Sequence, residues 1–122
     1  MEIHGREIKF RRTVLGNCKI AEMSPKKDIN RFDELLNSDY ATSQQAAAKF
    51  MAALSEGHEM NQRFENPDYE MHPLTTEEAL LLDGDVFNDL FTEALAAFAG
   101  DTPTVETEPV KEKGKNANGD SE

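Results

Sequence analysis

The chain has 122 residues, with 24 acidic and 13 basic side chains and a formal charge of −11. This length predicts a single domain, and the one cysteine, Cys18, excludes the intrachain disulfides of small secreted scaffolds. No apolar run approaches the roughly 20 residues of a membrane span, and no N-terminal segment has the order of a secretory signal. We therefore expect no membrane partner and, because the net charge repels phosphate backbones, no nucleic-acid partner.

The charge is distributed unevenly along the chain. Residues 1–31 carry eight basic and four acidic side chains, a net +4. Residues 32–100 carry two basic and fourteen acidic side chains, and residues 101–122 carry three and six. The basic and acidic parts can attract each other within one fold, or they can drive head-to-tail association of separate copies. We favour attraction within one fold, because summed surface charge argues only weakly for association.

The last part of the chain, residues 101–122, has no aromatic residue and only two valines. A segment of this composition cannot bury enough apolar area to offset the entropy lost on ordering. We therefore predict one folded domain over residues 1–100, followed by a disordered acidic tail over residues 101–122.

The first predicted element is a β-hairpin over residues 2–12. Its turn signal is His4-Gly5-Arg6, and Ile8 and Phe10 then alternate with charged residues, as in a half-buried strand. Because an isolated hairpin is marginally stable in water, its apolar face is expected to pack on helices.

Two helices are predicted before residue 37. The first runs from Val14 to about Met23, with Thr13 as its N-cap and Ser24-Pro25 at its end. Its expected buried face consists of Val14, Cys18 and Ala21, with Leu15 at the edge. The second is a short helix over residues 28–36, whose apolar stripe consists of Ile29, Phe32, Leu35 and Leu36.

A long helix is predicted over residues 42–64, after the break at residues 37–39. The residues that follow the 3–4 spacing of a buried face are Ala46, Ala47, Phe50, Met51, Leu54, His58 and Asn61. Gly57 is expected to weaken this helix by about 1 kcal/mol relative to alanine. Asn66-Pro67-Asp68 ends the helix, and residues 66–74 form a loop.

Two further helices complete the predicted domain, which is mainly α (α+β): a hairpin and about five helices. Thr75 and Glu78 form a capping box before a helix over residues 77–82. Asp85 is the predicted cap of a last helix over residues 86–99, and Gly100 suits the position just after its end.

No pattern of side chains points to catalysis or to a metal site. The histidines at positions 4, 58 and 72 are dispersed, and the chain has no HExxH, CxxC, GxSxG, Walker A or GxGxxG motif. Residues 83–89 begin like a calcium loop, but Phe87 and Asn88 stand where a ligand and a glycine are required. Cys18 is expected to pack as a small apolar residue. We therefore expect no enzyme activity, no metal and no cofactor.

Apolar helix faces are the remaining candidates for function. One hypothesis is that such a face binds a helical partner, as in helix-in-groove recognition. The alternative, which we favour, is that the same residues form the core. The candidate partner-binding residues are Phe50, Met51, Leu54, Phe87, Phe91 and Leu95.

Seven short segments occur in a characteristic order, followed by a charged, lysine-containing tail. The segments are Ile8-Lys9-Phe10, Thr13-Val14-Leu15, Ile20–Pro25, the helix carrying Ile29, Phe32 and Leu35, Phe64–Glu70, Pro73-Leu74-Thr75 and Glu93–Thr102. This order resembles the tail assembly chaperones of long-tailed siphophages and their prophages. The resemblance covers nearly all of residues 1–101.

The resemblance implies a function in tail morphogenesis. In this family the client is the tape measure protein, which is very long, helical and apolar and would aggregate alone. A small acidic chaperone coats it, keeps it soluble and helps recruit tail tube subunits, and it is absent from the mature virion. The expected partners are therefore the tape measure protein and the tail tube protein, with possible self-association, in the cytoplasm of the bacterial host. An acidic surface suits this role, because like charges keep a coated polymer dispersed.

Two other classes of function are kept as alternatives. A head–tail connector or minor tail protein would remain in purified virions. An acidic mimic of DNA would bind a basic host protein, with an affinity that falls steeply as salt is added. The net +4 of residues 1–31 argues against the mimic.

Overall fold

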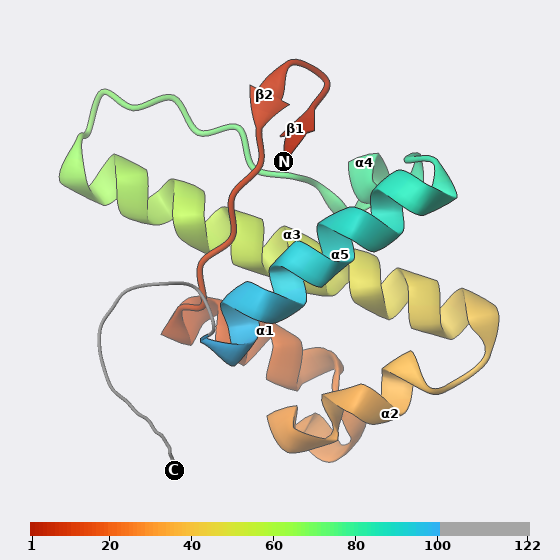
Figure 1. Cartoon of the computed structure of the whole chain (residues 1–122). Helices are drawn as coiled ribbons and strands as arrows, with labels where there is room; N and C mark the ends of the chain where they lie inside the picture. The colour runs from red at the N-terminus through yellow and green to blue at the C-terminus, as the bar shows by residue number, and fades with distance from the viewer. Residues whose placement is uncertain (101–122) are drawn as a thin grey trace, which may run out of the picture.

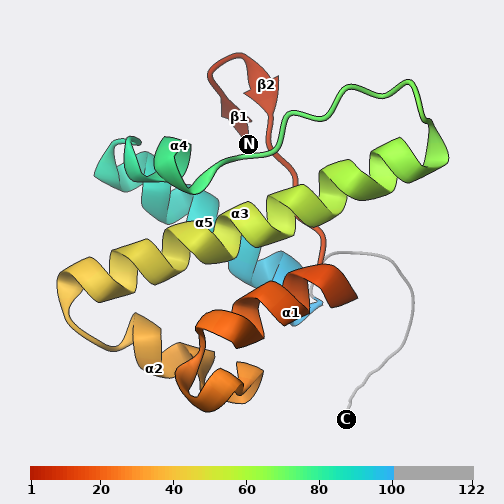
Figure 2. The same cartoon turned by 180° about the vertical axis from the view of Figure 1, so that it is seen from behind.

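The central element of the fold is α3 (Tyr40–Glu65), a helix of 26 residues around which the others are arranged (Figure 1). α1 (Val14–Met23) lies antiparallel beside α3, and α5 (Gly84–Ala99) crosses it (Figures 1 and 2). The computed structural model describes residues 1–100, and the tail that was predicted to be disordered, residues 101–122, lies outside the described residues. Within residues 1–100 the predicted architecture is confirmed: it is mainly α, with an N-terminal hairpin followed by five α-helices.

The hairpin is shorter than predicted. Strands β1 (Glu2–Ile3) and β2 (Arg6–Glu7) pair antiparallel, with Glu2 opposite Glu7 and Ile3 opposite Arg6. His4 and Gly5 form the turn with φ of 52° and 82°, the positive values that a tight two-residue hairpin turn requires. Residues 8–12 are extended but do not continue the second strand, because they leave the hairpin to cross α3.

The bounds of α1 and its cap agree with the prediction, but its buried face does not. The Thr13 side chain accepts a hydrogen bond from the Gly16 amide at 2.9 Å, which confirms the cap. The buried residues of α1 are Gly16 and Ile20, whereas Val14 and Cys18 are exposed. The reason is close packing: a Cβ added at Gly16 would lie 3.5 Å from the Ala53 carbonyl oxygen of α3. Gly16 and Ile20 therefore face the core, and Val14 and Cys18 point to solvent.

The predicted helix over residues 28–36 is only partly α-helical. Two 3₁₀ turns, Pro25–Lys27 and Ile29–Arg31, precede α2 (Phe32–Leu36). The Asp28 carboxylate accepts a hydrogen bond from the Asn30 amide at 3.0 Å, which stabilises a turn at this point instead of a longer helix. Phe32 is buried against the core, and the other three residues of the predicted stripe are partly buried there.

The three helices after α2 begin one or two residues earlier than predicted. α3 begins at Tyr40 because the Asp39 carboxylate accepts from the Thr42 amide at 3.1 Å. The Thr75 hydroxyl accepts from the Glu78 amide at 3.0 Å and caps α4 (Thr76–Leu80), as predicted. The other half of the predicted capping box is not formed, because the Glu78 carboxylate is bonded to Arg6 and His4. α5 begins at Gly84, so Asp83 occupies the cap position and Asp85 lies in the first turn. Asp85 is therefore not the cap.

The core is centred on an aromatic cluster around Phe50. Its ring stacks on Phe32, with centroids 5.2 Å apart, and meets Phe91 and Phe98 edge-on at 5.8 and 5.1 Å. The other large side chains that are fully buried are Ile8, Ile20, Met51, Leu54, Leu74 and Leu90. These residues come from the chain after the hairpin, α1, α3, the 66–75 loop and α5, so a single core joins all of these parts.

Residues 8–13 form a strap that crosses α3 and fixes the hairpin to the helices (Figure 1). The Arg11 amide donates to the Leu54 carbonyl oxygen at 3.0 Å. The Arg12 guanidinium lies 3.8 Å from the Phe98 ring centroid and donates to the Phe98 carbonyl oxygen at 2.8 Å. At the crossing, a Cβ added at Gly57 would lie only 2.9 Å from the Arg11 carbonyl oxygen. Gly57 therefore makes the close crossing possible.

Candidate functional site

The six candidate partner-binding residues lie at different depths. Phe50, Met51, Leu54 and Phe87 are buried in the core of the isolated chain. Phe91 is partly buried against that core, and Leu95 is 39% exposed. A direct role of these six residues in binding stays a prediction. The structure brings five of them together only as core packing, and it leaves Leu95 accessible.

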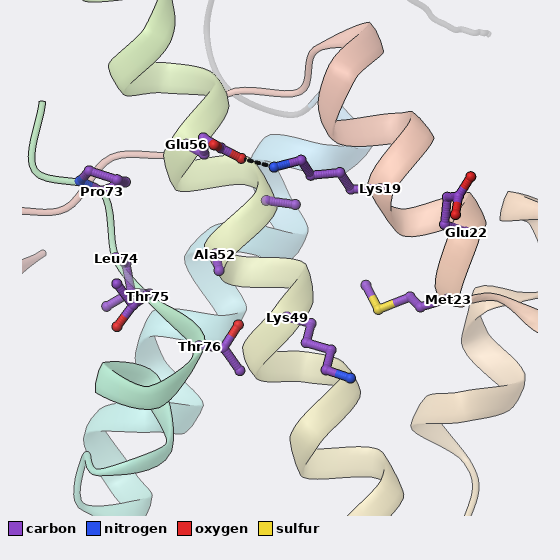
Figure 3. A pocket seen from close by; sticks show the side chains of 11 residues that line it. Lys19, Glu22, Met23, Lys49, Ala52, Glu56, Pro73, Leu74, Thr75 and Thr76 are labelled. Atoms are coloured by element: carbon purple, nitrogen blue, oxygen red, sulfur yellow. Dashed lines mark hydrogen bonds and ion pairs between the residues drawn. The ribbon is translucent and has the colours of Figure 1, made fainter.

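A groove lies between α1, α3 and the chain before α4 (Figure 3). Its volume is about 460 Å³. The floor is the solvent-facing side of α3 around Ala52, one wall is α1 with Met23, and the other wall is the chain from Pro73 to Thr76. The floor has only a methyl group at Ala52, so a partner can approach the α3 backbone closely.

An ion pair bridges the groove between its floor and one wall. The Lys19 ammonium of α1 donates to the Glu56 carboxylate of α3 (Figure 3). Because both side chains are only partly buried, solvent screens this pair, and its net contribution to stability is about 0–1 kcal/mol. The ion pair therefore shapes the groove more than it holds the two helices together.

Apolar side chains continue the groove along α1 and α3. Leu15 lies one turn before Lys19, and Met60 lies one turn after Glu56. Each therefore lies on the side of its helix that carries Lys19 or Glu56, and they are 43% and 42% exposed. Phe64, one further turn along α3, is 89% exposed.

We name this surface the α1–α3 face, after its two helices. It consists of Leu15, Lys19, Met23, Lys49, Ala52, Glu56, Met60, Arg63 and Phe64. The hydrophobic spacing does not indicate the α1–α3 face. It puts Leu15 at the edge of the predicted buried face of α1, and Met60 and Phe64 fall outside the stripe through Phe50 and Leu54. A pattern in the sequence does indicate this surface: positions 49, 52, 56, 60 and 63 also follow the 3–4 spacing, and they combine two cationic, one anionic and two apolar side chains.

A polar cluster fastens the hairpin to the loop before α4. The Arg6 guanidinium makes two hydrogen bonds to the Glu78 carboxylate, at 2.8 and 2.6 Å, and donates to the carbonyl oxygens of His72 and Pro73. The Nδ1 atom of His4 lies 3.0 Å from Oε2 of the same carboxylate. The Arg6 hydrogen bonds lower the pKa of Glu78 to about 2. A carboxylate held so firmly in its ionised form is suited to structure and not to proton transfer at neutral pH.

A second polar cluster anchors the loop on α3 through buried Glu59. Its carboxylate accepts from the Tyr69 hydroxyl at 2.9 Å and from the His72 amide at 2.9 Å. The hydrogen bond to Glu59 raises the pKa of Tyr69, and burial lowers the pKa of the neighbouring His58. The adjacent Ser55 hydroxyl accepts from the Leu74 amide at 2.8 Å. These bonds satisfy buried groups and position the wall of the groove.

The Arg6–Glu78 pair predicts an acid-sensitive contribution to stability. Because the pKa of Glu78 is lowered on folding, the contribution is fully present above about pH 4.5 and is lost as the pH falls towards 2. Glu78→Gln should cost about 1–2 kcal/mol at pH 7 and much less at pH 3. Urea unfolding of both proteins at the two pH values measures this. An equal difference at both pH values would show that the lost charge is not the cause.

Within residues 1–100, no three or more His, Cys, Asp or Glu side chains gather so that they could hold a metal ion. Over the same residues, no helix is both long enough and apolar enough to cross a bilayer. No protein-family model, curated protein or solved structure matches the chain.

Proposed function

We propose that the chain is a tail assembly chaperone of a siphophage or prophage. It binds the tape measure protein, keeps it soluble and helps recruit tail tube subunits, with several copies on one client. The observation that carries the proposal is the order of the segments along residues 1–101, which resembles this family. The domain is small, mainly helical and preceded by a short hairpin, and these features are compatible with that role.

The surface of the domain supports a role in coating an apolar helical client. Leu15, Met60 and Phe64 are exposed on helical surfaces, where apolar groups are favourable only if a partner covers them. The outer side of α5 is different, since Asp85, Asp89 and Glu93 are exposed there at intervals of one helical turn. A chain with exposed apolar side chains on α1 and α3 and acidic side chains on α5 can cover a client and keep the complex dispersed.

Co-expression with the tape measure protein encoded by a neighbouring gene tests the proposal. We expect the soluble yield of the tape measure protein to rise and the two proteins to co-purify, because the chaperone covers apolar helices that otherwise associate. An unrelated acidic helical protein of similar size and charge is the control, and it should leave the yield unchanged. The soluble fraction is quantified after centrifugation.

An unchanged yield together with no co-purification would contradict the proposal. Mass spectrometry of purified virions separates it from the nearest alternative. A chaperone is absent from the particle, whereas a connector or minor tail protein is retained in stoichiometric amounts.

A further inference from the structure

The α1–α3 face is left uncovered by every other part of the chain that the structure describes. Met60 and Phe64 lie on the last two turns of α3, which extend beyond the start of α1 (Figure 2). Between Lys49 and Phe64 the face spans 15 residues, or about 23 Å along the helix axis. This length equals that of a partner helix of about 16 residues.

The backbone of the face restricts what can cover it. The amide and carbonyl groups in the middle of α1 and α3 are already paired inside their helices, so the face offers no strand edge for an extended chain. A segment that covers an apolar surface must satisfy its own backbone hydrogen bonds. An α-helix does so, and its side chains can pack between α1 and the chain at residues 73–76 over the small Ala52.

The charges of the face indicate the chemistry of that helix. Lys49 and Arg63 are the only basic residues between positions 32 and 100, and both project from the exposed side of α3. Among residues 1–100, neither has a carboxylate within ion-pair distance, whereas Lys19 is paired with Glu56. The groove is also lined by one exposed carboxylate, Glu22 of α1, but the α3 side of the face carries two cations without an ion-pair partner among residues 1–100. In a domain with a large excess of acid, this side of the face is complementary to carboxylates on a partner.

We infer that the α1–α3 face binds an amphipathic helix of another protein, with a stripe of large apolar side chains flanked by acidic residues. Only the identity of that protein as the tape measure protein rests on the proposed function. Met60, Phe64 and Leu15 contact the apolar stripe, and Lys49 and Arg63 pair with the acidic flanks.

Two synthetic peptides test the chemistry of the partner directly. Both are 18-residue amphipathic helices with the same leucine stripe, one with glutamates and one with lysines beside the stripe. Fluorescence anisotropy of labelled peptide measures its affinity for the full chain. We expect the glutamate peptide to bind at least tenfold more tightly than the lysine peptide. The double variant Lys49→Glu with Arg63→Glu should reverse that preference.

Variants of the face locate the binding. Met60→Glu combined with Phe64→Glu should weaken binding of the glutamate peptide at least tenfold, and Phe64→Glu alone should give part of this effect. Met60 is 42% and Phe64 89% exposed, so circular dichroism should show an unchanged fold. Leu81→Glu is the matched control, because Leu81 is 83% exposed in the turn between α4 and α5 and is not part of the α1–α3 face. It should not change the affinity.

Three results would overturn the inference: equal affinity for the two peptides, an equal loss in Leu81→Glu, or a change in the sedimentation of the chain alone on Phe64→Glu. The last result would show that a second copy covers the face. Co-expression separates this inference from the proposed function. If wild type and the Met60/Phe64 variant solubilise the tape measure protein equally, the proposed function stands and the assignment of the face fails. If wild type does not solubilise it, the proposed function fails and the peptides still decide the inference.

Discussion

Replacing Phe50 by alanine is expected to lower the free energy of unfolding by about 3–5 kcal/mol. The ring is buried and contacts three other phenylalanines, so its removal leaves a cavity that helices from three parts of the chain would have to close. A domain of about 100 residues has a stability of roughly 5–15 kcal/mol. Urea unfolding followed by circular dichroism should therefore show a much lower midpoint or an unfolded protein.

Phe64→Ala is the matched control, since it removes the same side chain from the same helix at an exposed position. Surface changes of this kind are usually within about 0.5 kcal/mol of neutral. The two variants also decide between the two interpretations of the apolar stripe through Phe50. If Phe50→Ala kept its stability and lost only client binding, the stripe would be an interface that closes in the free chain.

Local signals predicted most of the fold. Thr13 and Thr75 cap their helices as their positions indicated, and Gly100 ends α5 with a φ of 79°. These features depend on residues a few positions apart, so the sequence contains the whole interaction. The hairpin turn at His4-Gly5 is local in the same sense.

Features that depend on contacts between distant segments were not predictable in this way. The face of α1 was misassigned because hydrophobic spacing favours Val14 and Cys18, whereas close packing of Gly16 on α3 turns Ile20 inward. The exposed side chains of the α1–α3 face also depend on how distant segments pack. With Gly16 and Ile20 facing α3, Leu15 is left at the surface, as Met60 is on α3, although both residues are apolar.

Gly57→Val is expected to destabilise the domain by about 3 kcal/mol, although valine is the better helix former of the two residues. Propensity alone predicts a small gain in stability. Contact with the strap makes the expected change in stability unfavourable instead. A Cβ at position 57 would lie 2.9 Å from the Arg11 carbonyl oxygen and 3.0 Å from the Thr13 side chain. A backbone carbonyl cannot rotate away as a flexible side chain can. The strap must therefore move, which lengthens the hydrogen bond between the Arg11 amide and Leu54.

Gly84→Ala is the control that separates the effect of contact with the strap from the effect of helix propensity. Gly84 also lies in a helix, but a Cβ there meets no atom within 4 Å. Alanine should stabilise the domain at this position by about 0.4–1 kcal/mol, through the lower entropy of the unfolded chain. Thermal unfolding of wild type and the two variants measures both shifts in the midpoint: we expect a decrease for Gly57→Val and an increase for Gly84→Ala. If both substitutions raised the midpoint, the strap would not be pressed against α3. The hairpin would then be held by its other contacts, which are the buried side chains of Ile3 and Ile8 and the hydrogen bonds of Arg6 to Glu78.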